Sequence, residues 1–296
     1  MKNKIFIVAI GLTAGLFLLL QSCKKTPENT QTDYKLEMET IKDAQYLQQF
    51  SNQFMLTFFK SIYDSTLINT GHAKIDSATA SLTNKNDSLN IRIEYWSDQE
   101  NLWHHIDSYQ HYRTGIYIFA ADSLFLENNT GDVTILTERT FYFDSLPVNI
   151  HNIHISKTGL SNSGNQTFRA IFDGIVMDGT YANKFTYQFS ATFNYELFKD
   201  HSTPYISSDD YIIFSGNIAG NTITGVNYQT QIDADTARYK IDFQCKYTIE
   251  GKSVITMESD KMPTNQALLD YISSDGCANY FEITFPDRFS SKRPIE

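Results

Sequence analysis

The stretch FTYQFSATFNYEL, residues 185–197, alternates large apolar side chains with polar ones at every second position. A period of two is typical of a β-strand with one buried and one solvated face, because successive side chains point to opposite faces. The stretch YKIDFQCKYTI, residues 239–249, repeats this pattern. Two long runs of this kind predict an antiparallel sheet with one face in water.

Shorter alternating runs surround these two stretches, and turn residues separate most of them. Strands are expected at 75–83, 89–96, 115–120, 133–143, 148–156, 167–176, 211–218, 222–232, 253–259 and 280–285. Connections this short favour antiparallel neighbours. We also expect one helical turn around Ala267, within 261–275. The fold class is therefore mainly β: an antiparallel meander folded as a sandwich, half-barrel or barrel, in a single domain over 72–290.

Residues 34–63 contain no glycine or proline and carry an apolar stripe with spacings of three and four. The stripe consists of Leu47, Phe50, Phe54, Phe58 and Ile62. This spacing predicts one amphipathic helix. We expect its stripe to pack on the strands 185–197 and 239–249, with docking on a partner protein as the alternative.

The chain begins with Lys2, Lys4 and an uncharged apolar run over 5–20. This run is shorter than the roughly 20 residues of a membrane-spanning helix, so it predicts a secretion signal. It ends Leu20-Gln-Ser-Cys23, which resembles the lipobox of bacterial lipoprotein signal peptides. The resemblance implies cleavage before Cys23 and attachment of fatty acyl chains such as palmitate to it. Residues 1–22 would be the signal peptide and 23–33 a lipidated flexible tether; the alternative is an ordinary signal peptide with an incidental cysteine.

The charge of the chain limits its partners. The formal net charge is −10, and removal of residues 1–22 would leave −12 because that segment holds two lysines and no acid. A nucleic-acid binder needs clusters of lysine and arginine, so we expect no nucleic-acid partner. An anionic membrane surface would repel the mature chain, so attachment should depend on the lipid anchor.

Several short motifs resemble a group of uncharacterised cell-envelope lipoproteins of Bacteroidota. The motifs are Arg113-Thr-Gly115, Gly131-Asp-Val-Thr134, Thr158-Gly159, Gly216, Gly225, and Cys245 with Gly251 and Gly276-Cys-Ala-Asn279. The resemblance implies a β-rich fold and a location in the cell envelope, on the outer membrane facing the periplasm or the cell surface. No catalytic residue can be inferred from this resemblance.

Cys245 and Cys277 remain once Cys23 is assigned to the lipid. An even pair of cysteines in an exported protein predicts a disulfide. Closing a loop of about 30 residues would stabilise the fold by roughly 3 kcal/mol. A buried free thiol at Cys245 is the alternative.

Six triplets have the form aspartate, hydroxyl residue, small or aliphatic residue, where composition alone predicts about 1.4. Their hydroxyl residues are Ser65, Ser77, Ser88, Ser123, Ser145 and Thr236. The pattern resembles the O-glycosylation acceptor of exported Bacteroidota proteins. Turns that lead into strands explain the same pattern, because aspartate and serine side chains bond to nearby backbone.

The seven histidines suggest no metal centre. His105, Asp107 and His111 share a face only in an extended strand, where neighbours at i and i+2 lie about 6.5–7 Å apart and are too far apart to chelate. The chain also lacks Gly-x-Ser-x-Gly, His-Glu-x-x-His and a phosphate-binding glycine loop. We therefore assign no catalytic residue, metal ligand or cofactor.

Four aromatic residues cluster in sequence, and we expect them to form a binding patch: Trp96, Trp103, Tyr109 and Tyr112. Exposed aromatic side chains can stack on sugars or dock a protein. The leading hypothesis is a membrane-anchored, non-catalytic lipoprotein that binds or organises an envelope protein, glycan or lipid. The alternative is a carrier that holds a lipid or other apolar ligand in a curved sheet, and an unidentified hydrolase is the third.

Overall fold

The chain divides into two units, Met1–Tyr34 and Lys35–Glu296, and nearly all of the structure described here belongs to the second. The computed structural model describes residues 34–85, 87–95, 106, 111–179, 186–200, 202–233, 237–245, 248–272, 277, 280–287 and 290–294. The helices are α2 (Lys35–Tyr63), α3 (Ser65–Thr70) and a short 3-10 helix, η1 (Ile150–Asn152).

The strands are β1 (His72–Ile75), β2 (Ala78–Lys85), β3 (Ser88–Glu94), β4 (Arg113–Asp122), β5 (Thr130–Phe143), β6 (Leu146–Val148), β7 (Ile153–Leu160), β8 (Gln166–Asp178), β9 (Thr186–Phe198), β10 (Tyr211–Asn221), β11 (Asn227–Ile232), β12 (Tyr239–Asp242), β13 (Gly251–Glu258), β14 (Gln266–Tyr271), β15 (Tyr280–Thr284) and β16 (Ser290–Pro294). All belong to one sheet, and every pairing is antiparallel.

Most strands pair with their neighbours in sequence, so the sheet is a long meander that runs from β1 to β16. Two strands depart from this order: β7 pairs with both β5 and β8, and β12 pairs with β10 beside β11. In the part of the chain that the structure describes, no pairing joins β1 to β16. The expected mainly β fold with one N-terminal helix is confirmed, and the described sheet is open.

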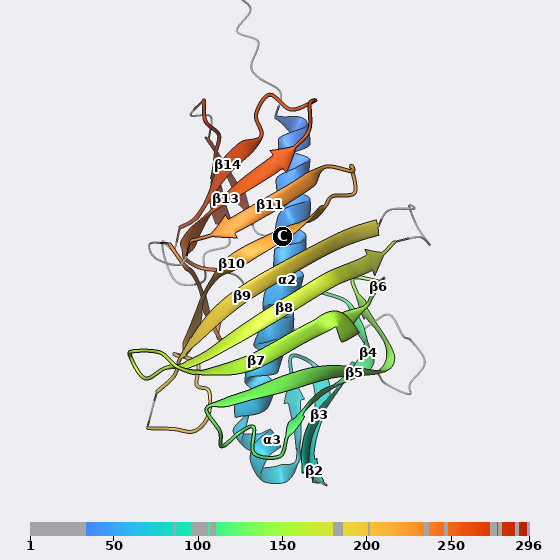
Figure 1. Cartoon of the computed structure of the whole chain (residues 1–296), viewed down its shortest axis with the longest axis vertical. Coiled ribbons are helices and arrows are strands. Elements are labelled where there is room, and N and C mark those ends of the chain that lie inside the picture. The colour runs from blue at the N-terminus through green and yellow to red at the C-terminus, as the bar shows by residue number, and fades with distance from the viewer. Residues whose placement is uncertain are drawn as a thin grey trace, which may run out of the picture. The chain divides into compact units, whose positions relative to one another are not determined.

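Helix α2 lies against the inner face of this sheet, and the strands cross it obliquely (Figure 1). The ring of Phe54 stacks on Tyr117 of β4 at a centroid distance of 5.4 Å and lies 6.3 Å from Phe172 of β8. The ring of Phe50 lies 5.2 Å from Phe143 of β5 and 6.1 Å from Phe189 of β9. The apolar stripe is therefore packed directly on aromatic rings of the sheet.

The expected partners of the stripe need one correction. We expected strand 239–249 beneath it, but the chain turns at Phe243, so β12 ends at Asp242. Phe243 contacts Phe59, which is not part of the stripe, at 6.5 Å. The alternation of apolar and polar residues continues through the turn. For this reason the sequence pattern predicted a strand that runs past its true end.

The surroundings of α2 also differ from those of an amphipathic helix. Twenty of its 29 residues are buried, and half of these are polar, including Gln48, Asn52 and Gln53. The polar side of the helix was expected to face water. Because strands as distant as β4 and β14 contact the same helix, its polar side is covered as well.

Two tight hairpins turn at an aspartate–serine pair. Asp76-Ser77 joins β1 to β2 and Asp144-Ser145 joins β5 to β6, and all four residues have positive φ. Two consecutive residues with positive φ make the type I′ turn, whose twist matches that of the flanking strands. The expected strand 75–83 therefore begins too early, because the turn at Asp76-Ser77 separates β1 from β2. Residues 78–83 lie in β2 as expected.

Residues 266–271 form β14, where we expected a helical turn. The run Ala267-Leu-Leu269 suits a helix locally, but Leu269 is buried on one face of the sheet while Leu268 points to the exposed face. Pairing with β13 and β15 decides the conformation of this short segment. Tertiary context commonly overrides helix propensity in this way.

The ring packing predicts a large effect of one substitution. Phe54→Ala should lower the free energy of unfolding by about 3–5 kcal/mol, because it leaves a cavity among Tyr117, Phe119 and Phe172. Leu160→Ala, at a side chain 54% exposed, is the control and should change it by less than about 0.5 kcal/mol. Denaturant unfolding measures both, and equal effects of the two substitutions would contradict this packing.

Candidate functional site

One residue of the predicted aromatic patch is described, and it is exposed. Tyr112 exposes 43% of its surface and pairs through an isolated bridge with Ile106, which exposes 48%. The backbone of Tyr112 exchanges two hydrogen bonds with Asp144 of the β5–β6 turn, at 3.0 and 2.7 Å. We call Ile106 and Tyr112 the exposed pair. The following predicted residues lie outside the described ones: Cys23, Trp96, Trp103, Tyr109 and Thr236.

His111 holds this segment on the sheet. Its Nδ1 lies 2.7 Å from a carboxylate oxygen of Asp144, and its ring stacks on Phe143 at 4.5 Å. His151 and His154 are exposed, and His105 lies outside the described residues. Among the residues that the structure describes, no three His, Cys, Asp or Glu side chains converge on a common point.

A buried arginine lies beside this segment. It belongs to the Arg113-Thr-Gly115 motif, to which the sequence assigned no role. Arg113 is 1% exposed and donates to the Gln53 side-chain oxygen at 2.6 Å, the Tyr95 hydroxyl at 3.0 Å and the Thr57 hydroxyl at 3.2 Å. Arginine stays protonated in proteins, so it serves as a hydrogen-bond donor and not as an acid or base. The guanidinium therefore fastens the start of β4 to α2. The one signal in the sequence is that Gln53 and Thr57, four residues apart, lie on the same helix face and can accept from one donor.

A second buried polar group runs along α2. Its members are the half-buried Gln45 and the buried Gln48, Gln49, Asn52 and Gln53, which we call the amide stripe. Each has one side-chain nitrogen or oxygen without a hydrogen-bond partner in the described structure. Leaving a buried polar atom unpaired costs about 1–3 kcal/mol. Five such atoms on nine consecutive residues therefore mark the least satisfied part of the core.

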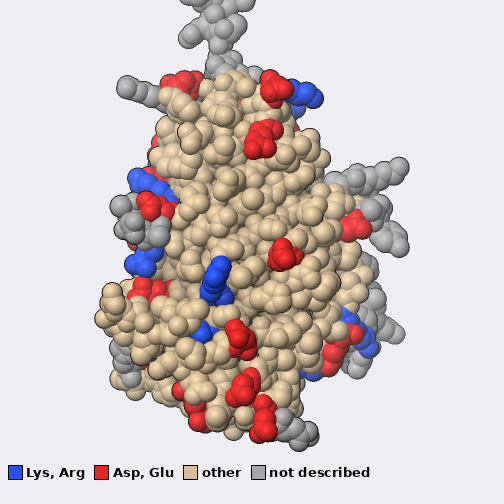
Figure 2. Space-filling model, viewed as in Figure 1, with Lys and Arg blue, Asp and Glu red and all other residues tan. Residues whose placement is uncertain are grey.

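The middle of the outer face of β9–β11 and β13 carries uncharged side chains, and the exposed Lys252 and Glu258 lie near the ends of β13. Figure 2 shows that acidic and basic residues are sparse over these strands and gather mainly around them. Side chains that point outward and lie opposite one another on paired strands belong to Ser190, Thr192, Asn217, Gln229, Gln231, Val254 and Thr256. Electrostatic attraction therefore contributes little to any contact made by this face.

Glu196 of β9 lies at the margin of that face in a cluster of donors. Its carboxylate accepts from Ser163 Oγ, Asn165 Nδ2 and an Arg238 guanidinium nitrogen, each at 3.0 Å. Burial raises the pKa of Glu196, but the hydrogen bonds from Asn165, its neighbouring serines and Arg238 outweigh this and lower it to about 2. The cluster ties the β7–β8 loop to β9.

The described aspartate–hydroxyl triplets all serve as local turns or caps. Asp64 accepts the backbone N–H of Leu67 and caps α3, and Asp122 accepts that of Leu124 at 2.8 Å. Asp87, with φ of 61°, lies in the β2–β3 turn. The serines that follow these aspartates and those of the two hairpins are half-buried or exposed: Ser65, Ser77, Ser88, Ser123 and Ser145. Their use as glycan acceptors stays a prediction.

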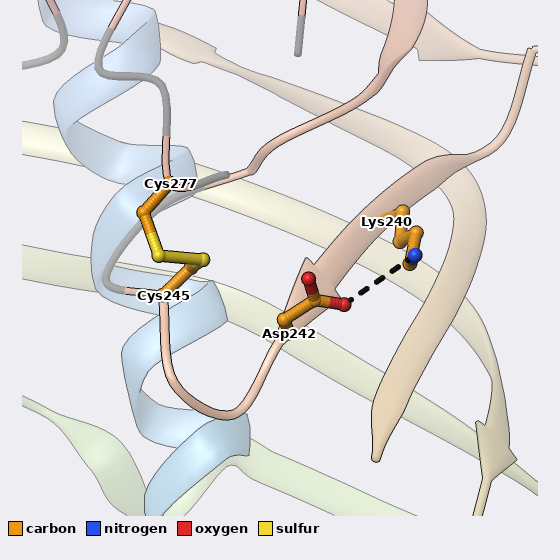
Figure 3. Close-up of a disulfide and its surroundings, with 4 residues drawn as sticks. All are labelled: Lys240, Asp242, Cys245 and Cys277. Carbon is orange, nitrogen blue, oxygen red and sulfur yellow. Dashed lines mark ion pairs between the residues drawn. A yellow bond between two sulfur atoms is a disulfide. The ribbon is translucent and has the colours of Figure 1, made fainter. Parts of the chain in front are cut away.

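The structure joins Cys245 to Cys277 by a disulfide, with Cα atoms 5.1 Å apart. Figure 3 shows the bridge in front of α2, on the side away from the central strands, next to the Lys240–Asp242 ion pair of β12. Cys245 is buried and Cys277 is exposed. The bridge therefore links the segment after β12 to the segment between β14 and β15, close to the helix.

No protein-family model, curated protein or solved structure matches this chain. None of the described helices has an apolar stretch that could span a bilayer. The described geometry thus offers an exposed pair, a buried polar stripe and a neutral outer face as candidate sites.

Glu196 predicts a pH-dependent contribution to stability. Because its pKa is lowered in the folded state, its ionised form stabilises the fold above the usual glutamate pKa, and this is lost as the pH falls toward 2. Glu196→Gln should therefore lower the free energy of unfolding at pH 7 and have a shrinking effect between pH 4.5 and 2. Glu127→Gln, at an exposed carboxylate, controls for the change in net charge. A pH-independent difference in denaturant unfolding between wild type and Glu196→Gln would contradict this role.

The disulfide predicts the reactivity of the thiols. Native protein should add no alkylating reagent at Cys245 or Cys277 until a reductant is present, after which mass spectrometry should find both modified. Alkylation of both residues without reductant would contradict the bridge. Unfolding in denaturant without reductant controls for burial, because only a covalent bridge protects Cys245 in the unfolded chain.

Proposed function

We propose that this chain is a lipid-anchored protein of the bacterial cell envelope that binds or organises another envelope component and has no catalytic role. The anchor would be Cys23, after removal of residues 1–22, and residues 24–33 would form the tether. The partner would be a protein, glycan or lipid of the envelope. The resemblance to Bacteroidota lipoproteins supports the outer membrane as the location, facing the periplasm or the cell surface.

The packing of α2 is the observation that carries this proposal. All five members of the apolar stripe are at most 3% exposed, and the rings of its three phenylalanines contact rings of the protein's own sheet. A carrier of an apolar ligand would need space between the stripe and the sheet, and that space is occupied by side chains. This arrangement supports the proposal that the protein recognises its partner through its outer surface.

The exposed pair supports the position of the recognition surface. Ile106 and Tyr112 are large, exposed residues joined by an isolated bridge, and the backbone of Tyr112 is bonded to Asp144. Both lie within the sequence region of the predicted aromatic patch. Exposed aromatic and apolar side chains that lie next to each other are typical of contact surfaces.

The anchor is tested by Cys23→Ala, which should release the protein from membranes or leave an uncleaved precursor. Lys25→Ala, two residues away, is the control and should stay membrane-bound at the mature mass. Unchanged detergent partitioning and unchanged mass of the Cys23→Ala protein would refute the anchor.

The recognition surface is tested separately in intact cells. A photo-crosslinking residue in place of Ile106 should give one discrete adduct, and the same residue in place of the exposed Leu160 should not. Tyr112→Ser should weaken the Ile106 adduct without changing thermal stability. Equal labelling from both positions, or from neither, would argue against a specific surface at the exposed pair.

A further inference from the structure

Three large apolar side chains are exposed on the outer face of the β14–β15 hairpin. Leu268 exposes 36% of its surface, Ile272 41% and Tyr280 54%. Tyr271 pairs with Phe281 near the turn end of this hairpin. One residue beyond that pair, Ile272 and Tyr280 lie across from each other. We call Leu268, Ile272 and Tyr280 the apolar hairpin face.

A row of charged residues crosses this face between Leu268 and the other two members. The Lys252 ammonium lies 2.6 Å from the Asp270 carboxylate. Asp270 is paired with Glu282 of β15, which is paired with Lys292 of β16. The two positive and two negative charges cancel. The apolar hairpin face therefore combines exposed apolar groups with polar surroundings of zero net charge.

The disulfide fixes the turn end of the hairpin. Cys277 lies between Ile272 and Tyr280 in the chain and is joined to Cys245, which follows β12 (Figure 3). The turn end is therefore tied to a second part of the sheet and not only to its own two strands. A contact made by Ile272 and Tyr280 would for this reason orient the whole fold.

The hairpin lies beside the first part of α2 (Figure 1). The backbone N–H of Thr264, which precedes β14, donates to Glu37 at 3.3 Å, and the Tyr271 hydroxyl donates to Gln45. Gln45 follows Lys35, the first residue of α2, by ten residues, which is about 15 Å along the helix axis. The apolar hairpin face thus belongs to the end of the fold where α2 begins.

The length of chain before α2 sets how far this end can be from an anchor at Cys23. Eleven residues, 24–34, separate Cys23 from Lys35. An extended chain spans at most about 3.5 Å per residue, so Lys35 would stay within about 40 Å of the lipid surface. The apolar hairpin face can therefore reach that surface without any change in the described elements.

We propose that the apolar hairpin face contacts the lipid surface that holds Cys23 and so orients the fold on the membrane. This inference rests on the lipid anchor of the proposed function. Tyrosine and aliphatic side chains favour the boundary between lipid headgroups and acyl chains. Because its row of charges sums to zero, the face avoids the repulsion that anionic headgroups exert on the acidic chain as a whole.

A lipid surface fits this face better than a protein partner does. A specific protein contact buries about 800 Å² on each partner, more than three separated side chains supply. A chain that is already tethered to the membrane is held there at a high effective concentration, so a small apolar contact is enough to select one orientation.

The test is photo-crosslinking of the full chain in intact cells. A photo-crosslinking residue in place of Tyr280 should give an adduct with the mass of a membrane lipid. The same residue in place of Leu160, which is also 54% exposed, is the matched control and should give none. A protein adduct at position 280, or equal lipid labelling at both positions, would overturn the proposal.

A second pair of variants tests the rest of the face. Leu268→Ser with Ile272→Ser should reduce the lipid adduct at position 280 at least fivefold and leave thermal unfolding unchanged, because both side chains are exposed. Leu136→Ser, at a side chain 46% exposed on β5, is the control and should leave the adduct unchanged. An undiminished adduct in the double variant would contradict a contact made by the apolar hairpin face.

The intact mass of the same samples separates this inference from the proposed function. Protein that carries acyl chains at Cys23 and sediments with membranes, but gives no lipid adduct at position 280, would overturn the hairpin contact and leave the anchor in place. Protein without acyl chains would overturn the anchor and the hairpin contact together.

Discussion

The fold depends on the contact between the rings of α2 and the rings on the inner face of the sheet. Phe58 illustrates the density of this contact, with Phe119, Phe125 and Phe168 all within 6.4 Å. Burial of a large aromatic side chain stabilises a fold by roughly 1.5–3 kcal/mol relative to exposure. In a meander each strand pairs mainly with its neighbours in the chain, so the helix is the common support that distant strands contact.

Wrapping strands around one helix also forces polar groups into the interior. Asp43 shows how the protein accommodates this: it is 7% exposed and accepts from the backbone N–H of Ile223 at 3.1 Å and from the Tyr187 hydroxyl. Burial raises the pKa of its carboxyl group despite these bonds. The buried charge of Arg113 is likewise hydrogen-bonded, in this case to three side-chain acceptors. The amide stripe differs because its groups are only partly satisfied by the described residues.

The candidate sites could be predicted from sequence to very different degrees. Tyr112 was identified because aromatic residues cluster near it, and it is exposed as a contact residue should be. Cys245 and Cys277 were paired by counting cysteines. The sequence did not predict burial of the amides at 45–53, because glutamine and asparagine in a helix normally face solvent. Only the three-dimensional cover over the polar side of α2 turns them into a candidate site.

Local chemistry in the sequence determined the strands, the helix and most turns. Alternation at 186–197 predicts β9 because the strand repeat is short-range and visible in one stretch. The tertiary structure decided which segments were interrupted, as at Phe243, and which were paired against their propensity, as at Leu268. It also decided that α2 is enclosed rather than half-exposed. Enclosure of α2 depends on the curvature of the whole sheet. That curvature results from many contacts between residues far apart in the chain, so no local pattern of side chains encodes it.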